Sequence, residues 1–278
     1  MNIDKIFLPC AGMGTRMGPL GQIIPKPLWP VVDVSILDIN IKVLTDTLER
    51  PVVINTHHLS DSFNNYPYRY AVPEILFEKK LLGSGGAFHN LKVNLKEKVI
   101  FTGNPDSILI LSKRDWNELA SFSKKFQNIL IALPVSIDSS YNRLIVENSL
   151  FKGIEPPNSS TSSITYSGFG LINLESFDFV QGPSSFFDTV INPKINNTGV
   201  YIPDSFEYWD FGTIELYKKK IMALLMEESK LNTYLKESID KSMKKKGGDL
   251  ESPLLKVSLN EEQEFQIYNC QGKRWHEV

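Results

Sequence analysis

The chain has 278 residues, of which 42% are hydrophobic, and its 30 basic and 32 acidic residues give a formal net charge of −2. A chain of this length can bury a large core. The near-neutral balance argues against a nucleic acid or an anionic membrane surface as the main partner. Any anion that the chain binds must therefore be held by a local group of residues.

The ends and the cysteine content predict a cytoplasmic protein. The sequence opens on Met1–Lys5 and enters a short apolar run at once, without the pattern of a signal peptide. No stretch reaches the about 18 apolar residues of a transmembrane helix. Cys10 and Cys270 lie too far apart in sequence to suggest a disulfide framework or a zinc site. We expect reduced thiols, no nucleic-acid or membrane partner, and a monomer or a dimer.

The first third of the sequence alternates between predicted strands and helices. Residues 5–9, 51–55 and 99–102 are short, apolar strands, and residues 71–77 form a weaker strand that Pro73 places at an edge. A helical period covers residues 36–48, and a second helix opens at Ser84. This order predicts an α/β fold with a Rossmann-like, doubly wound, mainly parallel (mixed) sheet that binds ligands at the carboxyl ends of its strands.

The rhythm changes after residue 129. We expect strands at 129–135 and 167–172, part of a hairpin at 143–147, and a mobile, breaker-rich loop at 156–163. The longest helical pattern covers residues 214–246, with Lys244–Lys246 as a basic helix end before Gly247 and Gly248. The predicted domains are a catalytic domain at 1–220 and, at 221–278, a C-terminal helix with an appended segment that could form two strands.

A glycine-rich loop follows the first strand. Gly12 and Gly14 allow a tight turn that brings backbone N–H groups to a phosphate, and Arg16 adds a bidentate donor. Lys26, between two prolines, supplies a point charge on a stiff backbone. The loop lacks the Gly-Lys-Ser/Thr ending of the Walker pattern and, at Met17, the third glycine of the dinucleotide fingerprint. The residues therefore predict a phosphate site of another kind.

The loop resembles the opening of the sugar-1-phosphate nucleotidyltransferase family. The resemblance covers roughly residues 3–220, and Asn55–Leu59 is similar to a stretch of the N-acetylmuramate-1-phosphate uridylyltransferase and mannose-1-phosphate guanylyltransferase branch. The matching motifs, in chain order, are Leu8–Met17, Pro25–Leu28, Leu82–Gly86, Tyr141–Leu144, Ser167–Phe169 and Tyr208–Thr213.

The resemblance implies a nucleotide-diphospho-sugar transferase fold and an enzyme of NDP-sugar biosynthesis for the cell envelope. Such an enzyme joins an NTP to a sugar 1-phosphate and releases pyrophosphate. The implied catalytic residues are Arg16, Lys26 and Asp210. The implied nucleotide-binding residues are Ala11, Gly12, Gly14, Thr15, Glu78, Ser84, Gly85, Gly86 and Asn104. The implied sugar-phosphate residues are Asn142, Glu155 and Gly168.

Magnesium is implied as well, held by two aspartates in the family. One matches Asp210, but Asn104 stands in the other aspartate position, and either Asn104 or Asp106 could take its place. Pro156 replaces a phosphate-binding lysine of the family, which leaves Lys152 as a candidate substitute. Both departures keep open a homologue that binds nucleotide or sugar phosphate without turnover. A choline-phosphate cytidylyltransferase-like enzyme, marked by an aromatic cage, is a further alternative.

Overall fold

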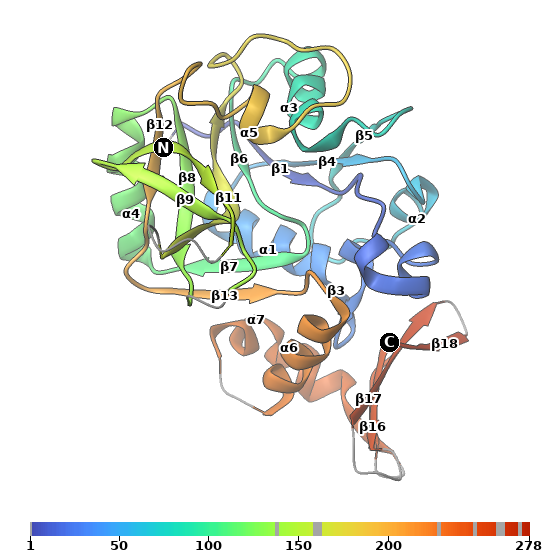
Figure 1. Cartoon of the computed structure of the whole chain (residues 1–278). Coiled ribbons are helices and arrows are strands. Elements are labelled where there is room, and N and C mark those ends of the chain that lie inside the picture. Colours follow the sequence, from blue (N-terminus) through green and yellow to red (C-terminus); the bar gives the residue numbers. More distant parts are fainter. Residues whose placement is uncertain are drawn as a thin grey trace.

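The structure is a computed structural model of the chain and describes residues 2–136, 139–157, 163–226, 229–246, 249–259, 265–271 and 274–278. A nine-stranded sheet runs through the molecule, with helices on both of its faces (Figure 1). In spatial order its strands are β5 (Glu74–Phe77), β4 (Val52–Thr56), β1 (Lys5–Pro9), β6 (Val99–Thr102), β11 (Ile164–Asn173), β8 (Asn128–Pro134), β12 (Thr198–Tyr201), β10 (Leu150–Glu155) and β9 (Arg143–Glu147).

The half of the sheet that carries the glycine loop is parallel. β4 pairs in parallel with β5 and β1, and β1 pairs in parallel with β6. β11 runs antiparallel to both β6 and β8, and β9 and β10 form an antiparallel hairpin. Because parallel strands end at a common edge, the segments after β1, β4, β5 and β6 gather there. The predicted mixed, doubly wound fold is confirmed, with β5 as the edge strand.

Helices cover the sheet on two sides because its strands alternate their apolar residues. Ile6 and Leu8 belong to the core shared with α1 (Ile36–Leu48) and α4 (Lys113–Phe122), whereas Phe7 belongs to the core shared with α3 (Gly83–Asn94) and α5 (Phe186–Thr189). The other helices are α2 (Ser60–Asn64), α6 (Ile214–Met226), α7 (Lys230–Ser242) and the 3-10 helices η1 (Thr15–Gln22), η2 (Lys26–Leu28) and η3 (Ser123–Lys125). Among the described helices, none has the length and apolarity needed to span a membrane.

The helix predicted over 214–246 is wrong in its continuity and in its end, because the structure has two helices followed by a strand there. α6 ends at Met226, and a new helix, α7, begins after Ser229, whose Oγ accepts a hydrogen bond from Asn232 N at 3.0 Å. Lys244–Lys246 is not a helix end but strand β14, paired with β15 (Asp249–Glu251). The register sets Lys244 opposite Glu251, an opposite-charge pair that stabilises two neighbouring strands. Residues 247–248 and most of the predicted mobile loop, 158–162, lie outside the described residues.

The C-terminal segment forms a small antiparallel sheet rather than two strands. It consists of β14, β15, β16 (Leu255–Leu259), β17 (Phe265–Gln271) and β18 (Arg274–Glu277), below the main sheet in Figure 1. The hydroxyl of the buried Tyr217 of α6 donates a hydrogen bond to Pro30 O at 2.6 Å and lies 2.9 Å from the side-chain amide of Asn269. One side chain therefore joins α6, the N-terminal region and the small sheet. The division of the chain at residue 220 stays a prediction.

Two further strand pairs complete the fold. β2 (Pro30–Val31) pairs with β3 (Val34–Ser35), and β7 (Ser107–Leu111) pairs antiparallel with β13 (Phe206–Asp210). The β7–β13 register places Asp210 opposite Ser107, directly after Asp106. This pair brings two distant parts of the sequence to one end of the molecule.

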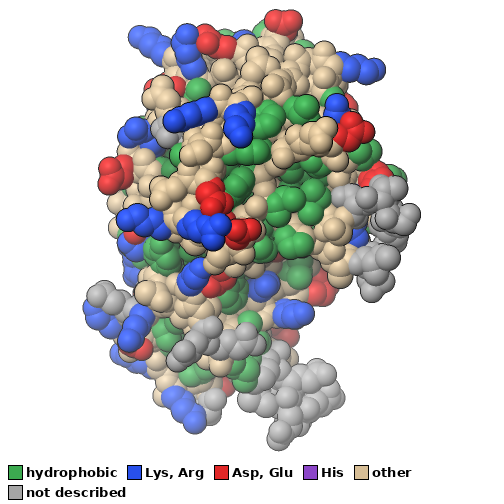
Figure 2. All heavy atoms as spheres, turned by 90° about the vertical axis from the view of Figure 1, so that its left-hand side faces the viewer, with side chains coloured by type: hydrophobic (Ala, Val, Ile, Leu, Met, Phe, Trp, Pro, Cys, Tyr) green, Lys and Arg blue, Asp and Glu red, His purple; other side chains and the backbone are tan. Residues whose placement is uncertain are grey.

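The face that carries α4 and β9 is turned to the viewer in Figure 2, where hydrophobic side chains gather between charged ones. Three exposed apolar residues lie on β9, on β10 and directly after β12, in the same region of the fold: Ile145, Ile154 and Ile202.

Candidate functional site

The glycine loop folds back on itself directly after β1. Gly14 has φ 65°, in the left-handed region that favours glycine, and precedes η1. A Cβ added to Gly21 would lie 2.4 Å from the Gly14 carbonyl oxygen, so the absence of a side chain lets the two segments touch. At Gly12, in contrast, an added Cβ would meet nothing within 4 Å. The loop is packed on its inner side and open at Gly12.

A cavity of about 340 Å³ lies beside this loop. Its walls come from the glycine loop, from the Lys26 segment and from the segment that follows β6. Its lining is Pro9, Cys10, Gly12, Met13, Gly14, Thr15, Arg16, Lys26, Pro27, Asn104, Pro105 and Asp106. The predicted phosphate residues and both candidates for the second metal ligand therefore face one space. Ala11 is buried within the loop.

Lys26 lines this cavity and is fixed by two contacts. Its ammonium forms an ion pair with Asp106 and donates a hydrogen bond to Gly212 O at 3.1 Å. Its side chain is only 11% exposed, and prolines precede and follow it. Arg16, by contrast, is exposed, and within the described part of the chain its guanidinium has no hydrogen bond or ion pair. One cation is thus fixed, and the other is available to an incoming anion.

Asp210 ends β13 with both carboxylate oxygens engaged. Oδ1 accepts a hydrogen bond from Gly212 N at 2.6 Å, and Oδ2 accepts one from the Tyr141 hydroxyl. Burial, followed by the hydrogen bond and negative charge of Asp210, raises the pKa of Tyr141 well above its ordinary value. The charges of Arg16 and Asp106 also act on this hydroxyl. These groups therefore share one electrostatic environment.

Asn104 and Gly168 lie against each other. Gly168 has φ 86°, and an added Cβ would lie 2.3 Å from Asn104 Nδ2. The exposed Asn104 side chain thus occupies the space that a larger residue at 168 would fill. β11 has an irregular register between Tyr166 and Gly170, which is where this glycine turns the backbone.

The candidate metal ligands are close to one another but already occupied. Asp106 turns toward the cavity after Pro105, as a role in metal binding requires, but it forms an ion pair with Lys26. Asp210 binds the Tyr141 hydroxyl. Across the described ranges, no three His, Cys, Asp or Glu side chains cluster as a metal site. A cation at this point therefore has to displace protein contacts.

The second glycine motif packs closely against the segment 182–186. Gly85 N donates to Ser184 O at 2.8 Å, and a Cβ added to Gly85 would lie 2.4 Å from Ser185 O. A Cβ added to Gly86 would lie 2.9 Å from Gly182 O. Ser84 Oγ accepts a hydrogen bond from Phe186 N at 3.0 Å. The two glycines thus let this segment approach the start of α3, and their predicted contact with a nucleotide stays a prediction.

Two of the predicted sugar-phosphate residues, Asn142 and Glu155, lie beside and on the β9–β10 hairpin. Asn142 follows Tyr141 directly, and Glu155 pairs in register with Arg143. The ammonium of Lys152, the candidate substitute for the lysine lost at Pro156, lies 3.6 Å from Glu147 in the same hairpin, and Lys152 does not line the cavity. Its role as a substitute stays a prediction.

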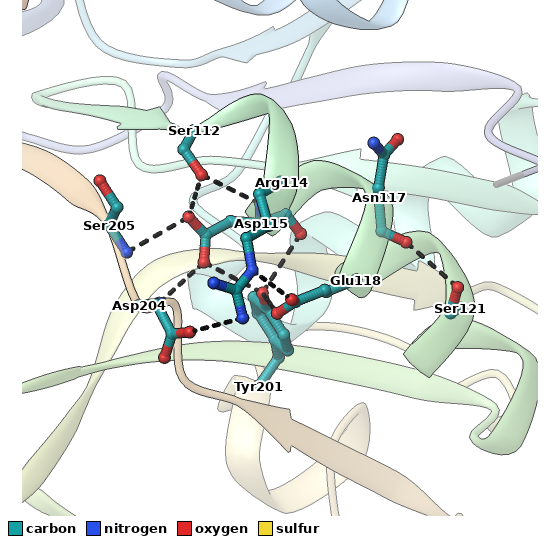
Figure 3. Close-up of polar contacts among 9 residues, drawn as sticks. All are labelled: Ser112, Arg114, Asp115, Asn117, Glu118, Ser121, Tyr201, Asp204 and Ser205. Carbon is teal, nitrogen blue, oxygen red and sulfur yellow. Dashed lines mark hydrogen bonds and ion pairs between the residues drawn. The ribbon is translucent and has the colours of Figure 1, made fainter.

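The entry into β13 is fixed by a buried aspartate that sequence reasoning missed. Asp115 is 1% exposed, and its carboxylate accepts hydrogen bonds from Asp204 N at 2.7 Å, Ser205 N at 3.2 Å and Tyr201 OH at 3.2 Å (Figure 3). Burial opposes its ionisation, but these bonds and one from Ser112 hold the pKa of Asp115 below its ordinary value. The Ser112-x-x-Asp115 spacing at the start of α4 is the available signal. The network holds the strand that ends at Asp210.

Residues 8–132 match the family described as nucleotidyl transferase. This part of the chain is similar to nucleotidyl transferases. The resemblance predicted from the sequence is confirmed at this level. Over 222 residues the chain is 24% identical to mannose-1-phosphate guanyltransferase 2 of Candida glabrata, covering 74% of this chain and 60% of that protein. It is also 24% identical, over 182 residues, to the bifunctional sugar-1-phosphate nucleotidylyltransferase/acetyltransferase of Sulfurisphaera tokodaii, covering 64% of this chain and 43% of that protein.

Solved structures show the same fold. HddC from Yersinia pseudotuberculosis superimposes with a TM-score of 0.67 at 17% identity, over 79% of this chain and 99% of that chain. UDP-glucose pyrophosphorylase from Acinetobacter baumannii superimposes with a TM-score of 0.65 at 17% identity, over 86% of this chain and 99% of that chain. The chain spans about 60% of the length of the Candida glabrata relative.

Proposed function

We propose that the chain transfers a nucleotidyl group from an NTP to a sugar 1-phosphate and releases pyrophosphate. The observation that carries this proposal is the cavity in which the glycine loop, Arg16 and Lys26 face Asn104 and Asp106. The match to the nucleotidyl transferase family and the names of the curated relatives support the same class of reaction.

The proposed reaction has no covalent enzyme intermediate. An oxygen of the sugar phosphate attacks the α-phosphorus of the NTP, and the bond to the bridging oxygen breaks, so that pyrophosphate leaves with the electron pair. Catalysis then consists of positioning and charge neutralisation. The loop N–H groups from Gly12 to Thr15 and the guanidinium of Arg16 would hold the triphosphate. Lys26 would release Asp106, bind the α-phosphate instead and neutralise part of its negative charge.

The residues around the cavity fit a magnesium ion. Asp106 and Asp210 offer carboxylates and Asn104 offers an amide oxygen, which are the hard donors that Mg²⁺ prefers. The bound ion would neutralise negative charge on the phosphates. Lys26 and the Tyr141 hydroxyl hold the two carboxylates, so we propose that both contacts rearrange when nucleotide and metal bind.

The remaining predicted residues have positions consistent with the two ends of a nucleotide sugar. We propose Ala11 and the start of α3 (Ser84, Gly85 and Gly86) for the nucleoside side, with Glu78 holding the start of α3 through its hydrogen bond from Leu82 N. Gly168, Asn142 and Glu155 belong to the opposite half of the sheet, on β11 and around the β9–β10 hairpin, and we propose them for the sugar phosphate.

The test is pyrophosphate release with Mg²⁺ across ATP, CTP, GTP, UTP and dTTP and a panel of sugar 1-phosphates. GTP with mannose 1-phosphate is the first pair, because of the name of the Candida glabrata relative. Release that needs both substrates supports the proposal. Binding of an NTP without pyrophosphate release in any combination would instead support a non-catalytic homologue. The uncharged side chain of Asn104 and the ion pair of Asp106 with Lys26 favour that alternative.

A further inference from the structure

A chain of buried hydrogen bonds links the two glycine loops. Cys10 N donates to Asn55 Oδ1 at 2.8 Å, and Asn55 Nδ2 donates to Glu78 Oε1 at 2.7 Å. Glu78 Oε2 in turn accepts from Leu82 N at 3.2 Å. Asn55 is 2% exposed and Glu78 is 3% exposed. This hydrogen-bond network therefore begins at the phosphate loop and ends at Leu82, the residue before α3.

The strand order explains why these residues meet. β1, β4 and β5 are adjacent and parallel, with Pro9 beside Asn55 and Asn55 beside Leu76 in the register. The three strands thus end at one edge, and the two side chains bridge the segments that leave it. The Glu78 backbone is fixed as well, since Glu78 N donates to Thr56 O at 2.8 Å and His57 Nδ1 donates to Glu78 O at 2.8 Å.

The arrangement of donors and acceptors is specific. The hydrogen-bond network ends on two backbone N–H groups, those of Cys10 and Leu82, which can only donate. The carboxylate of Glu78 can only accept. An amide at 55 and a carboxylate at 78 pair every group. The Asn55 amide orientation follows from this requirement, because its oxygen must face Cys10 N and its nitrogen must face Glu78. Neither residue is part of the lining of the phosphate cavity.

We infer that Asn55 and Glu78 are positioning residues that set the distance between the phosphate loop and the start of α3. This inference rests on the proposed function, because it assigns the two loops to two parts of one bound NTP. Binding such a ligand to both loops at once needs a fixed spacing, and a buried, fully paired network supplies rigidity. Glu78 acts here through Leu82 and Asn55 and does not itself contact the nucleotide.

A reciprocal exchange tests the inference. Asn55→Asp alone sets two carboxylate oxygens against each other, and Glu78→Gln alone leaves an amide donor facing another donor. In the double variant Asn55→Asp/Glu78→Gln, the carboxylate at position 55 accepts from Cys10 N and from the amide nitrogen at position 78. The amide oxygen at position 78 then accepts from Leu82 N. Each single variant therefore breaks one bond, and the double variant restores all three.

We expect each single variant to bind the preferred NTP at least about tenfold more weakly, as an unpaired buried polar group implies. The KM for the NTP should rise more than the KM for the sugar phosphate, and the double variant should recover most of the loss. Asn128→Asp is the matched control, because Asn128, at the start of β8 and away from both loops, is fully buried and donates a hydrogen bond to Ser176. It should lower Tm while the Kd for the NTP stays the same.

Hydrogen exchange of the peptides that contain Cys10 and Leu82 separates this inference from the proposed function. Faster exchange in both single variants and recovery in the double variant support the network even if wild type binds no NTP, a result that would count against the proposed function alone. Wild-type NTP affinity in both single variants would overturn the inference. So would a double variant that recovers Tm and exchange rates but not NTP affinity, because Glu78 would then contact the nucleotide directly.

Discussion

Replacing Lys26 with alanine is the substitution with the clearest expected effect. The ammonium pairs with Asp106, and the two side chains are 11% and 14% exposed. This burial lies between that of a surface ion pair and that of a fully buried one, so we expect a stability loss of about 2 kcal/mol. For a chain of this size the loss corresponds to a Tm lower by roughly 4 to 8 °C. The fold should stay intact, because the aliphatic core does not involve this side chain.

The effect on catalysis should be much larger. Removing a fixed positive charge from the site of phosphoryl transfer typically lowers kcat by about 100- to 1,000-fold. The assay is NTP-dependent pyrophosphate release, with far-UV circular dichroism to confirm folding. Lys98→Ala is the matched control, because Lys98 forms an exposed ion pair with Glu175 on another part of the surface. A folded Lys26→Ala variant with activity within about tenfold of wild type would show that the phosphate site has been misassigned.

Three other predictions test neighbouring groups. Tyr141→Phe frees Asp210 from the hydroxyl, so Mg²⁺ should bind about three- to tenfold more tightly by calorimetry; unchanged or weaker binding would contradict this. Asn104→Asp adds a charge at the usual metal position, so kcat/KM should stay equal or rise; a strong loss would show that the site depends on the amide. Burial and then the charge of Lys92 lower the pKa of His89, so its stabilising contribution is present above the unfolded pKa of about 6.5 and is lost as pH falls through the lower folded value. Chemical unfolding from pH 7.5 to 5 should show a steeper loss in wild type than in His89→Gln, and parallel curves would refute the role of His89.

Local patterns in the sequence predict much of the fold. β1, β4, β6 and β8 are short apolar runs, and α1 begins directly after Ser35, whose Oγ accepts a hydrogen bond from Asp38 N at 3.0 Å. The break between α6 and α7 could have been found from Ser229, which is a suitable cap residue. That Lys244–Lys246 forms a strand and not a helix end could not have been found in this way, because the strand depends on pairing with Asp249–Glu251.

The site is predictable where its motif is local and unpredictable where it depends on distant contacts. Gly12, Arg16 and Lys26 follow one strand, and the structure places them around one cavity. The contact of Tyr141 with Asp210 spans 69 residues, and that of Asn55 with Glu78 spans 23. Neither periodicity nor spacing in the sequence predicts such pairs, because it is the order of the strands in the sheet that brings the two residues of each pair together. The same holds for Gly85, whose missing side chain makes room for Ser185.

The fate of isotopic label tests nucleotidyl transfer most directly. The chain is incubated with Mg²⁺, a sugar 1-phosphate and the NTP that it prefers, labelled in one sample at the α-phosphate and in another at the γ-phosphate. We predict that the α label appears in the sugar nucleotide and the γ label in pyrophosphate, both dependent on the sugar 1-phosphate. Label that stays in the NTP in every combination, or an α label found in free nucleoside monophosphate, would contradict transfer to a sugar phosphate.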